Sequence, residues 1–433
     1  MTVVSGVSLP ALPSEAFTLG NGLRVRLIPL PHLQSATASF FVRVGSRYEG
    51  AQTNGLSHFL EHMLYRGTER HPVAHELNLA IERLGGTLDA ATHVDFTSYD
   101  LTLPPETIAN GTALLAEVLR QPLLTDLTTE KQIIREEILE DLNEAGEQID
   151  IDNVSRRLLY ADHPLGFAIP GPIANLDRFD STELRQHHTT HYTARNSVLC
   201  VAGAFDAKEI RGAIEAGFAD MPSGDAIEPT RVDDGQVDRF AYVQDPGSQT
   251  EVRVSFHTPG MTDDEAPTLL LLSRVLDDGL STRVHRTICE ERGLAYEAFA
   301  DNDSLEDCGV FDFGASVEHK KAPHLVGTVF ELVASLRERA PSVEEVEKAK
   351  RRYLWDLRTV RDDPEGAVHF VGGSALFGLP EELAVVAEKV ANVTPKGIQE
   401  AVRRHFDAED AHLTCVGVLD EALIGEVRDR ARV

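Results

Sequence analysis

The chain has few of the features that mark secreted, membrane-bound or disulfide-stabilised proteins. Only four cysteines occur among its 433 residues, and they show neither a CxxC pair nor the spacing of a disulfide framework. No apolar run approaches the roughly 20 residues that span a bilayer. The N-terminus lacks the basic start and apolar stretch of a secretory signal. We therefore expect a cytoplasmic protein with reduced thiols and no membrane association.

Basic residues are also scarce. Lys and Arg number 41 against 70 Asp and Glu, which gives a formal net charge of −29. A surface this negative repels nucleic acid and anionic membranes, so we expect neither as a partner. The acid excess is best explained by solubility and predicts no substrate preference. The apolar share of 42% and the charged share of 26% are typical of a soluble globular chain.

A faint internal repeat divides the chain into two halves. In each half, two strand-like segments precede a helix, a hairpin-like pair and long amphipathic helices, and a final strand closes the half. These closing strands are 197–203 and 412–417. Strands in groups and helices in groups predict an α+β fold and not alternating βαβ units. We expect two homologous domains, 1–222 and 239–433, each a mainly antiparallel sheet packed with helices, joined by a polar linker at 223–238.

Three ionisable residues lie together on a predicted core helix. The segment from Gly55 to Tyr65 contains no proline and is predicted to be helical. His58 and His62 are four residues apart, so their imidazoles stack on one face and can share one zinc ion. Glu61 flanks that face, where a general base for water belongs. An isolated histidine pair at this spacing is usually incidental. Three ionisable groups on a core helix are costly to bury, so we expect them to share one function.

A third metal ligand is expected elsewhere in the chain, because a catalytic zinc ion usually has three protein ligands and one open position. Glu130 and Glu137 are seven residues apart and flank the apolar stripe of a predicted helix, whereas Glu136 points away from that stripe. Helical phase therefore favours Glu137 over Glu136 as the ligand. Glu130 could orient a ligand histidine; the alternative is that it belongs to a salt-bridged helix surface.

The residues His58-x-x-Glu61-His62 form the inverted zinc motif. Other motifs accompany it: Gly55-Leu56-Ser57, Gly67-Thr68, Leu84-Gly85-Gly86, His163-Pro164-Leu165-Gly166, His191-Tyr192 and Arg292-Gly293-Leu294-Ala295-Tyr296. With them, nearly the whole chain closely resembles the pitrilysin family of metallopeptidases, and in its half size the bacterial processing-peptidase-like branch. The resemblance implies that His58, His62 and Glu137 bind one zinc ion per chain and that Glu61 activates water. It makes 1–222 the catalytic domain and implies that two such chains close around a peptide.

One departure from the family pattern concerns the second half, where the family has an arginine seven residues before a tyrosine. Tyr296 fits the tyrosine, but Cys289 stands at the arginine position, and a thiol cannot replace a guanidinium that binds a carbonyl group. Arg286 and Arg292, each about one helical turn away, are candidate substitutes. We expect a zinc-bearing subunit whose homologous partner chain supplies the Arg/Tyr pair in a heterodimer, with a homodimer as the second choice.

The family also binds the substrate backbone along an edge strand, which here carries Asp89, Ala90 and Ala91. Strand addition of this kind gives main-chain hydrogen bonds with little sequence selection. Asp89 stands where Asn is common, so the amide donor is lost. A second histidine pair, His187 and His191, has no carboxylate with ligand-like placement, and we expect it to serve in capping or packing.

The sequence thus predicts a zinc metalloendopeptidase that hydrolyses peptides or unfolded segments. The alternative is a non-catalytic peptide-binding or assembly subunit that retains the peptidase fold. The intact zinc motif argues against this alternative, and the cysteine at the arginine position argues for it.

Overall fold

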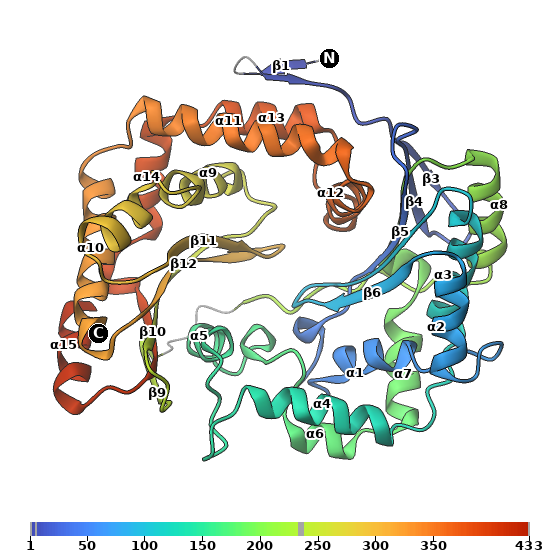
Figure 1. Cartoon of the computed structure of the whole chain (residues 1–433), viewed down its shortest axis with the longest axis horizontal. Helices are drawn as coiled ribbons and strands as arrows, with labels where there is room; N and C mark the ends of the chain where they lie inside the picture. Colours follow the sequence, from blue (N-terminus) through green and yellow to red (C-terminus); the bar gives the residue numbers. More distant parts are fainter. Residues whose placement is uncertain (1, 5–6, 233–237, 432–433) are drawn as a thin grey trace.

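The computed structural model describes residues 2–4, 7–232 and 238–431. These residues form one large sheet in each half of the chain and a two-stranded ribbon at the N-terminus (Figure 1). Strands and helices are segregated, which confirms the predicted α+β fold with a mainly antiparallel sheet in each half. No helix in this described part of the chain is both long enough and apolar enough to cross a membrane.

The first sheet has the strand order β3-β4-β8-β5-β7-β6, in which β4 and β8 are parallel and all other pairs antiparallel. Its strands are β3 (Glu15–Thr18), β4 (Arg24–Pro29), β5 (Ala36–Val42), β6 (Thr87–Thr92), β7 (Thr97–Leu103) and β8 (Ser197–Gly203). The central strands β5 and β8 are buried along their whole length. Both faces of the sheet are therefore covered, and β6 forms one of its edges.

The second sheet repeats this plan with the order β11-β12-β10-β13-β9, in which β13 and β9 are parallel. Its strands are β9 (Phe240–Gln244), β10 (Thr250–Pro259), β11 (Ala298–Ser304), β12 (Cys308–Val317) and β13 (His412–Gly417). The edge strand β11 thus corresponds to β6, and the closing strand β13 to β8. The ribbon at the N-terminus pairs β1 (Thr2–Val4) with β2 (Val7–Leu9).

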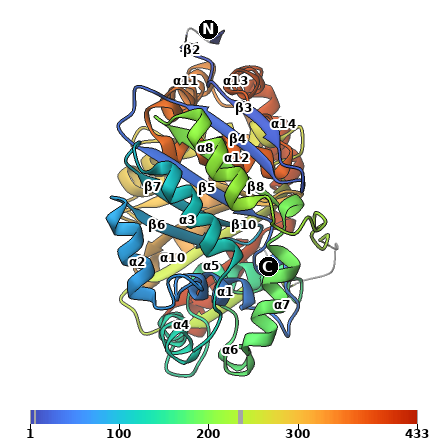
Figure 2. The ribbon, with the colours of Figure 1, turned by 90° about the vertical axis from the view of Figure 1, so that its right-hand side faces the viewer.

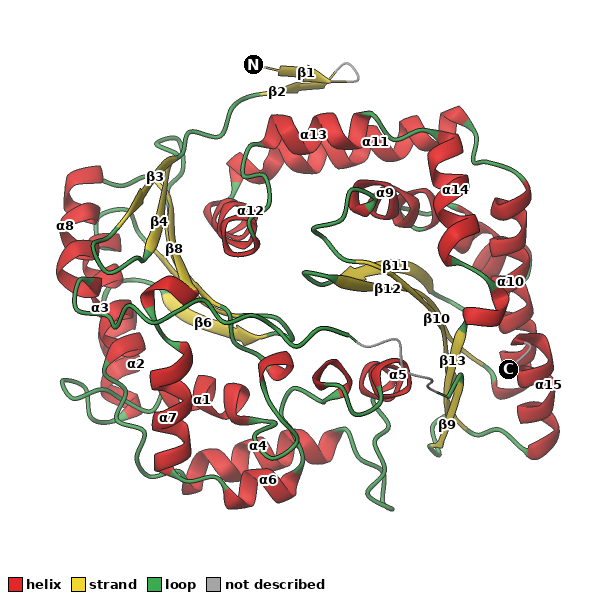
Figure 3. Cartoon of the chain, turned by 180° about the vertical axis from the view of Figure 1, so that it is seen from behind, coloured by secondary structure: helices red, strands yellow, loops and turns green. Residues whose placement is uncertain are grey.

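Most helices surround the two sheets, which lie toward the middle of the molecule (Figure 3). In the first half they are α1 (Leu56–Leu64), α2 (Ala74–Arg83), α3 (Ile108–Arg120), α4 (Thr128–Glu140), α5 (Ile151–Tyr160), α6 (Ile173–Arg178), α7 (Ser181–His191) and α8 (Ala207–Phe218). In the second half they are α9 (Ala266–Leu276), α10 (Ala322–Glu338), α11 (Val343–Thr359), α12 (Pro364–Phe377), α13 (Leu383–Ala391), α14 (Pro395–His405) and α15 (Glu421–Ala431). Helices α3 and α8 cross the outer face of the first sheet (Figure 2).

Each half places one helix against the sheet of the other half. Helix α12 of the second half packs on β5 and β8, and α5 of the first half packs on β13 and β10. Val368 and Val371 of α12 share a buried apolar cluster with Phe41 of β5. Gly372 makes this approach possible, because a Cβ atom there would lie 2.2 Å from the Phe41 ring. The two halves are therefore joined by core packing.

The predicted linker at 223–238 includes residues 233–237, which lie outside the described residues. Along the chain, β8 is the last strand of the first sheet and β9 is the first strand of the second. The exact limits of the two domains, 1–222 and 239–433, stay a prediction, because α5 and α12 each pack against the sheet of the other half.

Candidate metal centre

Helix α1 carries the two histidines and is held at its N-terminus by a carboxylate from the segment just before it. The Glu49 carboxylate accepts hydrogen bonds from the Ser57 backbone N–H at 2.6 Å, the Gly55 backbone N–H at 2.8 Å and Asn54 Nδ2 at 3.1 Å. These donors include amides that the first helical turn leaves without intrahelical partners. Burial raises the pKa of Glu49 while the bonds to Ser57 and Gly55 oppose that rise. Sequence reasoning missed Glu49, because its role depends on the path of the chain before the helix.

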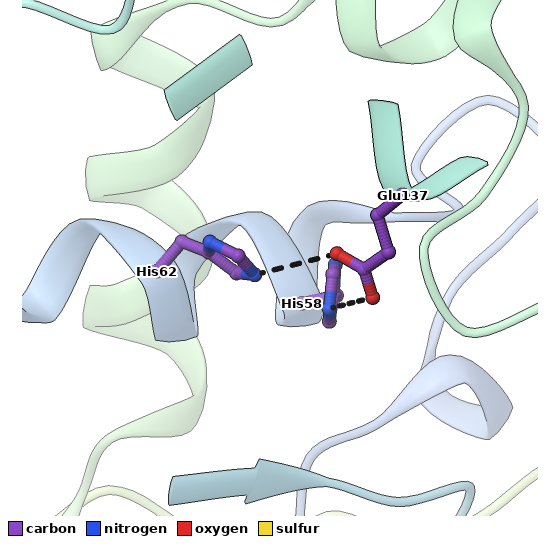
Figure 4. A group of neighbouring side chains, drawn as sticks. All are labelled: His58, His62 and Glu137. Atoms are coloured by element: carbon purple, nitrogen blue, oxygen red, sulfur yellow. Dashed lines mark ion pairs between the residues drawn. The ribbon is translucent and has the colours of Figure 1, made fainter. Parts of the chain in front are cut away.

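His58, His62 and Glu137 converge between α1 and α4 (Figure 4). Nε2 of His58 lies 3.3 Å from one Glu137 carboxylate oxygen, and Nε2 of His62 lies 3.7 Å from the other. The two imidazole rings are 4.6 Å apart between centroids. Glu136 and Glu137 are both exposed, and the contacts with the two histidines identify Glu137 as the carboxylate that faces them.

This donor set fits a zinc ion. Zinc takes imidazole nitrogen and carboxylate oxygen at about 2.0–2.2 Å, so two ligand atoms of one ion lie about 3–4 Å apart. The two nitrogen–oxygen distances at Glu137, 3.3 and 3.7 Å, fall in that range. The hydrogen bond from His58 lowers the pKa of Glu137, so this carboxylate is available in its ionised form. Among the described residues, this is the group of His, Cys, Asp and Glu side chains close enough together to hold a metal.

Glu130 lies behind His62, on the side away from Glu137. Its carboxylate is 3.1 Å from His62 Nδ1 and 3.2 Å from Arg66 Nη1, and the residue is only 5% exposed. Burial lowers the pKa of His62, but the hydrogen bond to Glu130 and the charges of Glu61 and Glu137 outweigh it, so the pKa is raised. A carboxylate on the far nitrogen fixes the tautomer of a ligand histidine and makes it more basic.

Glu61 is held by the end of the edge strand. Its Oε2 accepts a hydrogen bond of 2.6 Å from Oγ1 of Thr92, the last residue of β6. Helix α1 also packs against β6. The candidate base is therefore fixed next to the strand on which a peptide is expected to lie. Sequence reasoning missed Thr92, whose contact with Glu61 joins segments 31 residues apart.

The predicted substrate strand is β6, at the edge of the first sheet. Asp89 is exposed, while Ala90 and Ala91 are partly buried. Asp89 lies opposite Asp100 in the β6–β7 register and accepts a hydrogen bond from Thr87 Oγ1 at 3.2 Å. These three residues therefore lie on a free strand edge beside the helix that carries Glu61.

The second half places Tyr296 before β11, with 92% of the residue exposed. Cys289 lies in a π-helical segment, His285–Glu291, and is partly buried against the core of the second half. Burial raises the pKa of the Cys289 thiol, which leaves it a poor nucleophile at neutral pH.

Neither candidate substitute for the missing arginine is free. Arg286 Nε lies 2.7 Å from a Glu291 carboxylate oxygen. Arg292 donates to Thr328 Oγ1 at 2.6 Å and also pairs with Glu331. Both guanidinium groups therefore have anionic or hydroxyl partners within the second half.

The second histidine pair supports helix α1. Nε2 of His187 lies 3.0 Å from Oγ of Ser57. Ser57 is the residue directly before the ligand candidate His58. His187 and His191 are both buried. Burial, and for His187 also the neighbouring histidines, lowers the pKa of these imidazoles well below its usual value. They are therefore neutral packing groups next to the metal helix.

Comparison with known proteins gives a consistent family. Residues 24–172 match the family model described as "Insulinase (Peptidase family M16)", and residues 178–353 match "Peptidase M16 inactive domain". An uncharacterized zinc protease of Streptomyces coelicolor is 25% identical over 423 residues, which cover 95% of this chain and 91% of that protein. One of Mycobacterium leprae is 29% identical over 325 residues, covering 74% and 72%.

The fold is shared with solved structures. The crystal structure of a protease from Helicobacter pylori superposes with a TM-score of 0.83 at 18% sequence identity. The superposition covers 94% of this chain and all of that one. The two-half architecture is therefore that of a group of known proteins, and the described site lies in the half that matches the insulinase model.

Proposed function

Because this chain belongs to peptidase family M16, the pitrilysin family, we propose that it is a zinc-dependent endopeptidase acting on peptides or unfolded segments. The observation that carries the proposal is the convergence of His58, His62 and Glu137 on one point between α1 and α4. The names of its curated relatives as zinc proteases support zinc as the metal. The family model that residues 178–353 match is described as an inactive domain, which agrees with chemistry confined to the residues before them.

In the proposed mechanism, His58, His62 and Glu137 hold the ion and Glu130 orients His62. A bound zinc ion would supply Lewis-acid activation of water and of the scissile carbonyl group. Glu61 accepts the proton from the attacking water and passes it to the leaving nitrogen. Thr92 keeps one oxygen of Glu61 in place through its 2.6 Å hydrogen bond, so the carboxylate needs little reorganisation before it acts.

The edge strand β6 positions the substrate in this proposal. A peptide added along it would satisfy its own backbone groups and bring a peptide bond next to Glu61. Such binding depends little on the side chains of the substrate, which suits a peptidase that acts on extended segments. The exposed Asp89 provides one negative charge along this edge.

The decisive experiment separates metal binding from turnover. We expect the Glu61→Gln variant to keep one zinc ion per chain, measured by elemental analysis, and to lose hydrolysis of a quenched fluorogenic peptide. Glu137→Gln should lose zinc as well. Glu136→Gln, on the exposed neighbour, is the matched control and should keep both. Unchanged turnover in Glu61→Gln would refute the assigned role of the base.

We further propose that this chain is the zinc-bearing member of a heterodimer whose homologous partner supplies an Arg/Tyr pair. The support is Cys289 at the arginine position and the engagement of Arg286 and Arg292 with Glu291, Thr328 and Glu331. The Cys289→Arg variant should then raise peptide turnover of the purified chain alone, whereas Cys289→Ser should not. Full activity of the unmodified chain alone would contradict the heterodimer.

A second candidate function is a non-catalytic peptide-binding or assembly subunit, favoured by the same Cys289. It predicts peptide binding without turnover even when the zinc-loaded chain is mixed with homologous chains that carry the Arg/Tyr pair. Zinc content and peptide turnover, measured with and without such a chain, separate the two functions.

A further inference from the structure

His93 occupies a position next to the candidate base that the mechanism above does not use. It directly follows Thr92, whose side chain contacts Glu61. Thr92, Val94 and Asp95 around it are buried, yet His93 itself is exposed. Val94 lines a cavity of about 310 Å³ whose other walls include Phe299 of the second half. His93 therefore lies where the two halves meet beside the edge strand.

The exposure of His93 does not come from a loose loop. The His93 N–H donates to the Phe96 carbonyl at 2.8 Å, and the Arg47 N–H donates to the Val94 carbonyl at 3.1 Å. Gly45 packs against the same turn so closely that a Cβ atom would lie 2.2 Å from the His93 carbonyl oxygen. An exposed histidine on a fixed backbone is suited to contact a ligand.

The ring of His93 is held in one orientation. It stacks on Phe96, with 4.4 Å between centroids and 28° between the planes. Phe96 in turn packs edge-on against Phe377 of α12. Phe96 thus covers one face of the imidazole and is itself in contact with a helix of the second half. No hydrogen bond joins its ring nitrogens to any group in the described part of the chain.

The charges around His93 favour its neutral form. Partial burial and the nearby His369 lower the pKa of His93, against the opposing effect of Glu61 and Asp100. The opposite holds for His369, whose Nε2 lies 3.1 Å from Asp100 Oδ1, because that hydrogen bond raises the pKa of His369. A neutral imidazole offers one N–H donor and one acceptor nitrogen.

We propose that His93 binds the peptide substrate directly, with a ring N–H donating a hydrogen bond to a substrate backbone carbonyl next to the scissile bond. This proposal rests on the proposed function. A peptide aligned along β6 passes the end of that strand at Thr92 and meets His93 next. A backbone carbonyl fits better than a carboxylate, because Glu61 and Asp89 repel a negatively charged group in this region.

The proposal also accounts for the second half. Cys289 stands at the arginine position, and Arg286 and Arg292 are bound to Glu291, Thr328 and Glu331. In this proposal His93 gives the zinc-bearing half a hydrogen-bond donor of its own. The support from Phe377 and His369 on α12 would make this contact depend on how the second half packs. His93 would then be a binding residue whose position depends on contacts in both halves.

The test measures binding separately from turnover. The zinc-loaded Glu61→Gln chain is titrated with a capped, uncharged peptide that carries a neutral fluorophore and has a sequence that the wild-type chain cleaves, alone or with an Arg/Tyr-bearing chain. Adding His93→Ala should weaken binding by about threefold to tenfold, the usual effect of losing one hydrogen bond, with zinc content unchanged. His93→Gln, which keeps a donor, should recover part of the affinity. His324→Ala, an exposed histidine on α10, is the control and should bind as the parent does.

The outcomes distinguish the two proposals. If the wild-type chain cleaves peptides but His93→Ala binds them as tightly as the parent, the assignment of His93 is overturned and the proposed function stands. Loss of zinc in His93→Ala would show a structural role and would also overturn the assignment. If the wild-type chain cleaves no peptide with or without an Arg/Tyr-bearing chain, the proposed function fails and this proposal fails with it.

Discussion

At the scale of single residues, Glu130 offers a test of how the metal ligands are tuned. Its carboxylate holds Nδ1 of His62 at 3.1 Å. Partners of this kind typically change metal affinity by about 10–100-fold. We expect Glu130→Gln to weaken zinc binding to that extent while the chain stays folded. Competition with a chromophoric zinc chelator measures the change, and an unchanged affinity would show that Glu130 is only part of a helix surface.

Asp312 of β12 gives a prediction about pH. Burial, opposed by Arg253 and by the hydrogen bond from Ser255, raises the pKa of Asp312 to about 6. Because the folded state binds the proton more tightly than the unfolded chain, the stabilisation is present at low pH and is lost as pH rises through about 6. Asp312→Asn should therefore raise the melting temperature most at pH 8 and by a smaller amount at pH 5, because pH 5 lies between the unfolded-state pKa of about 4 and the folded-state pKa of about 6.

The two pH values serve as each other's control. Asn keeps an oxygen to accept the Ser255 hydroxyl, so the substitution removes the ionisation and leaves that acceptor in place. Differential scanning fluorimetry at pH 5 and pH 8 measures both differences. Equal shifts at the two pH values would contradict the assigned pKa direction.

At the residue level, the sequence indicates which side chains lie together where their spacing is local. The phase of one helix separates Glu137 from Glu136, because both belong to the same regular element. Glu49 and Thr92 are different, since each meets α1 or Glu61 through the tertiary path of the chain. Nothing in helical or strand periodicity indicates which carboxylate outside a helix will accept the amides of its first turn.

At the scale of elements, helix α1 depends on its unusual cap. Glu49 accepts two backbone amides and the Asn54 side chain within a buried site. In Glu49→Gln, an amide NH₂ would replace one accepting oxygen and leave a buried donor without a partner, at a cost of about 1–3 kcal/mol. We expect a lower free energy of unfolding and weaker zinc binding, because His58 lies in the first turn of this helix.

Chemical denaturation and zinc titration test this cap together. The matched control is Glu69→Gln, an exposed glutamate after α1, for which both quantities should stay close to wild type. If Glu49→Gln were as stable as the control and bound zinc equally, the carboxylate would not be what positions the metal helix.

The sequence predicts most elements but not how they pair across the halves. Alternating and grouped strands give the α+β class, and the closing strands β8 and β13 occupy equivalent places in the two sheets. Helix α12 is apolar on nearly all sides, which shows that it is buried but not against which sheet. Its contact with Phe41 through Gly372 joins residues more than 300 positions apart, beyond the reach of any local pattern.

At the scale of the whole molecule, a buried arginine connects the two halves. The side chain of Arg47 is 0% exposed. Its guanidinium lies 3.3 Å from Asp95 Oδ1 in the first half and 2.6 Å from Asp307 Oδ1 in the second. It also donates to the Thr230 carbonyl at 3.1 Å. Asp95 in turn accepts the Glu306 N–H at 3.0 Å, so one network joins the turn that carries His93 to the second half.

Arg47→Met should therefore destabilise the chain strongly. Removing one partner from a buried ion pair leaves uncompensated charge, which typically costs about 3–5 kcal/mol. Because Asp95 is the buried carboxylate of the pair, Arg47→Met combined with Asp95→Asn should recover part of that loss. Arg157→Met, which breaks an exposed pair with Asp162, is the control and should cost no more than about 1 kcal/mol.

Denaturant unfolding of these variants, together with peptide binding to the zinc-loaded chain, decides whether this network holds the halves together. If it does, Arg47→Met lowers the unfolding midpoint, and it also weakens peptide binding because the turn carrying His93 loses its anchor in the second half. A variant as stable as Arg157→Met would mean that the other contacts between the halves, including the packing of α5 and α12, are sufficient to hold them in place. Peptide binding would then be insensitive to Arg47, and the coupling between the edge strand and the second half would run through Phe377 and His369.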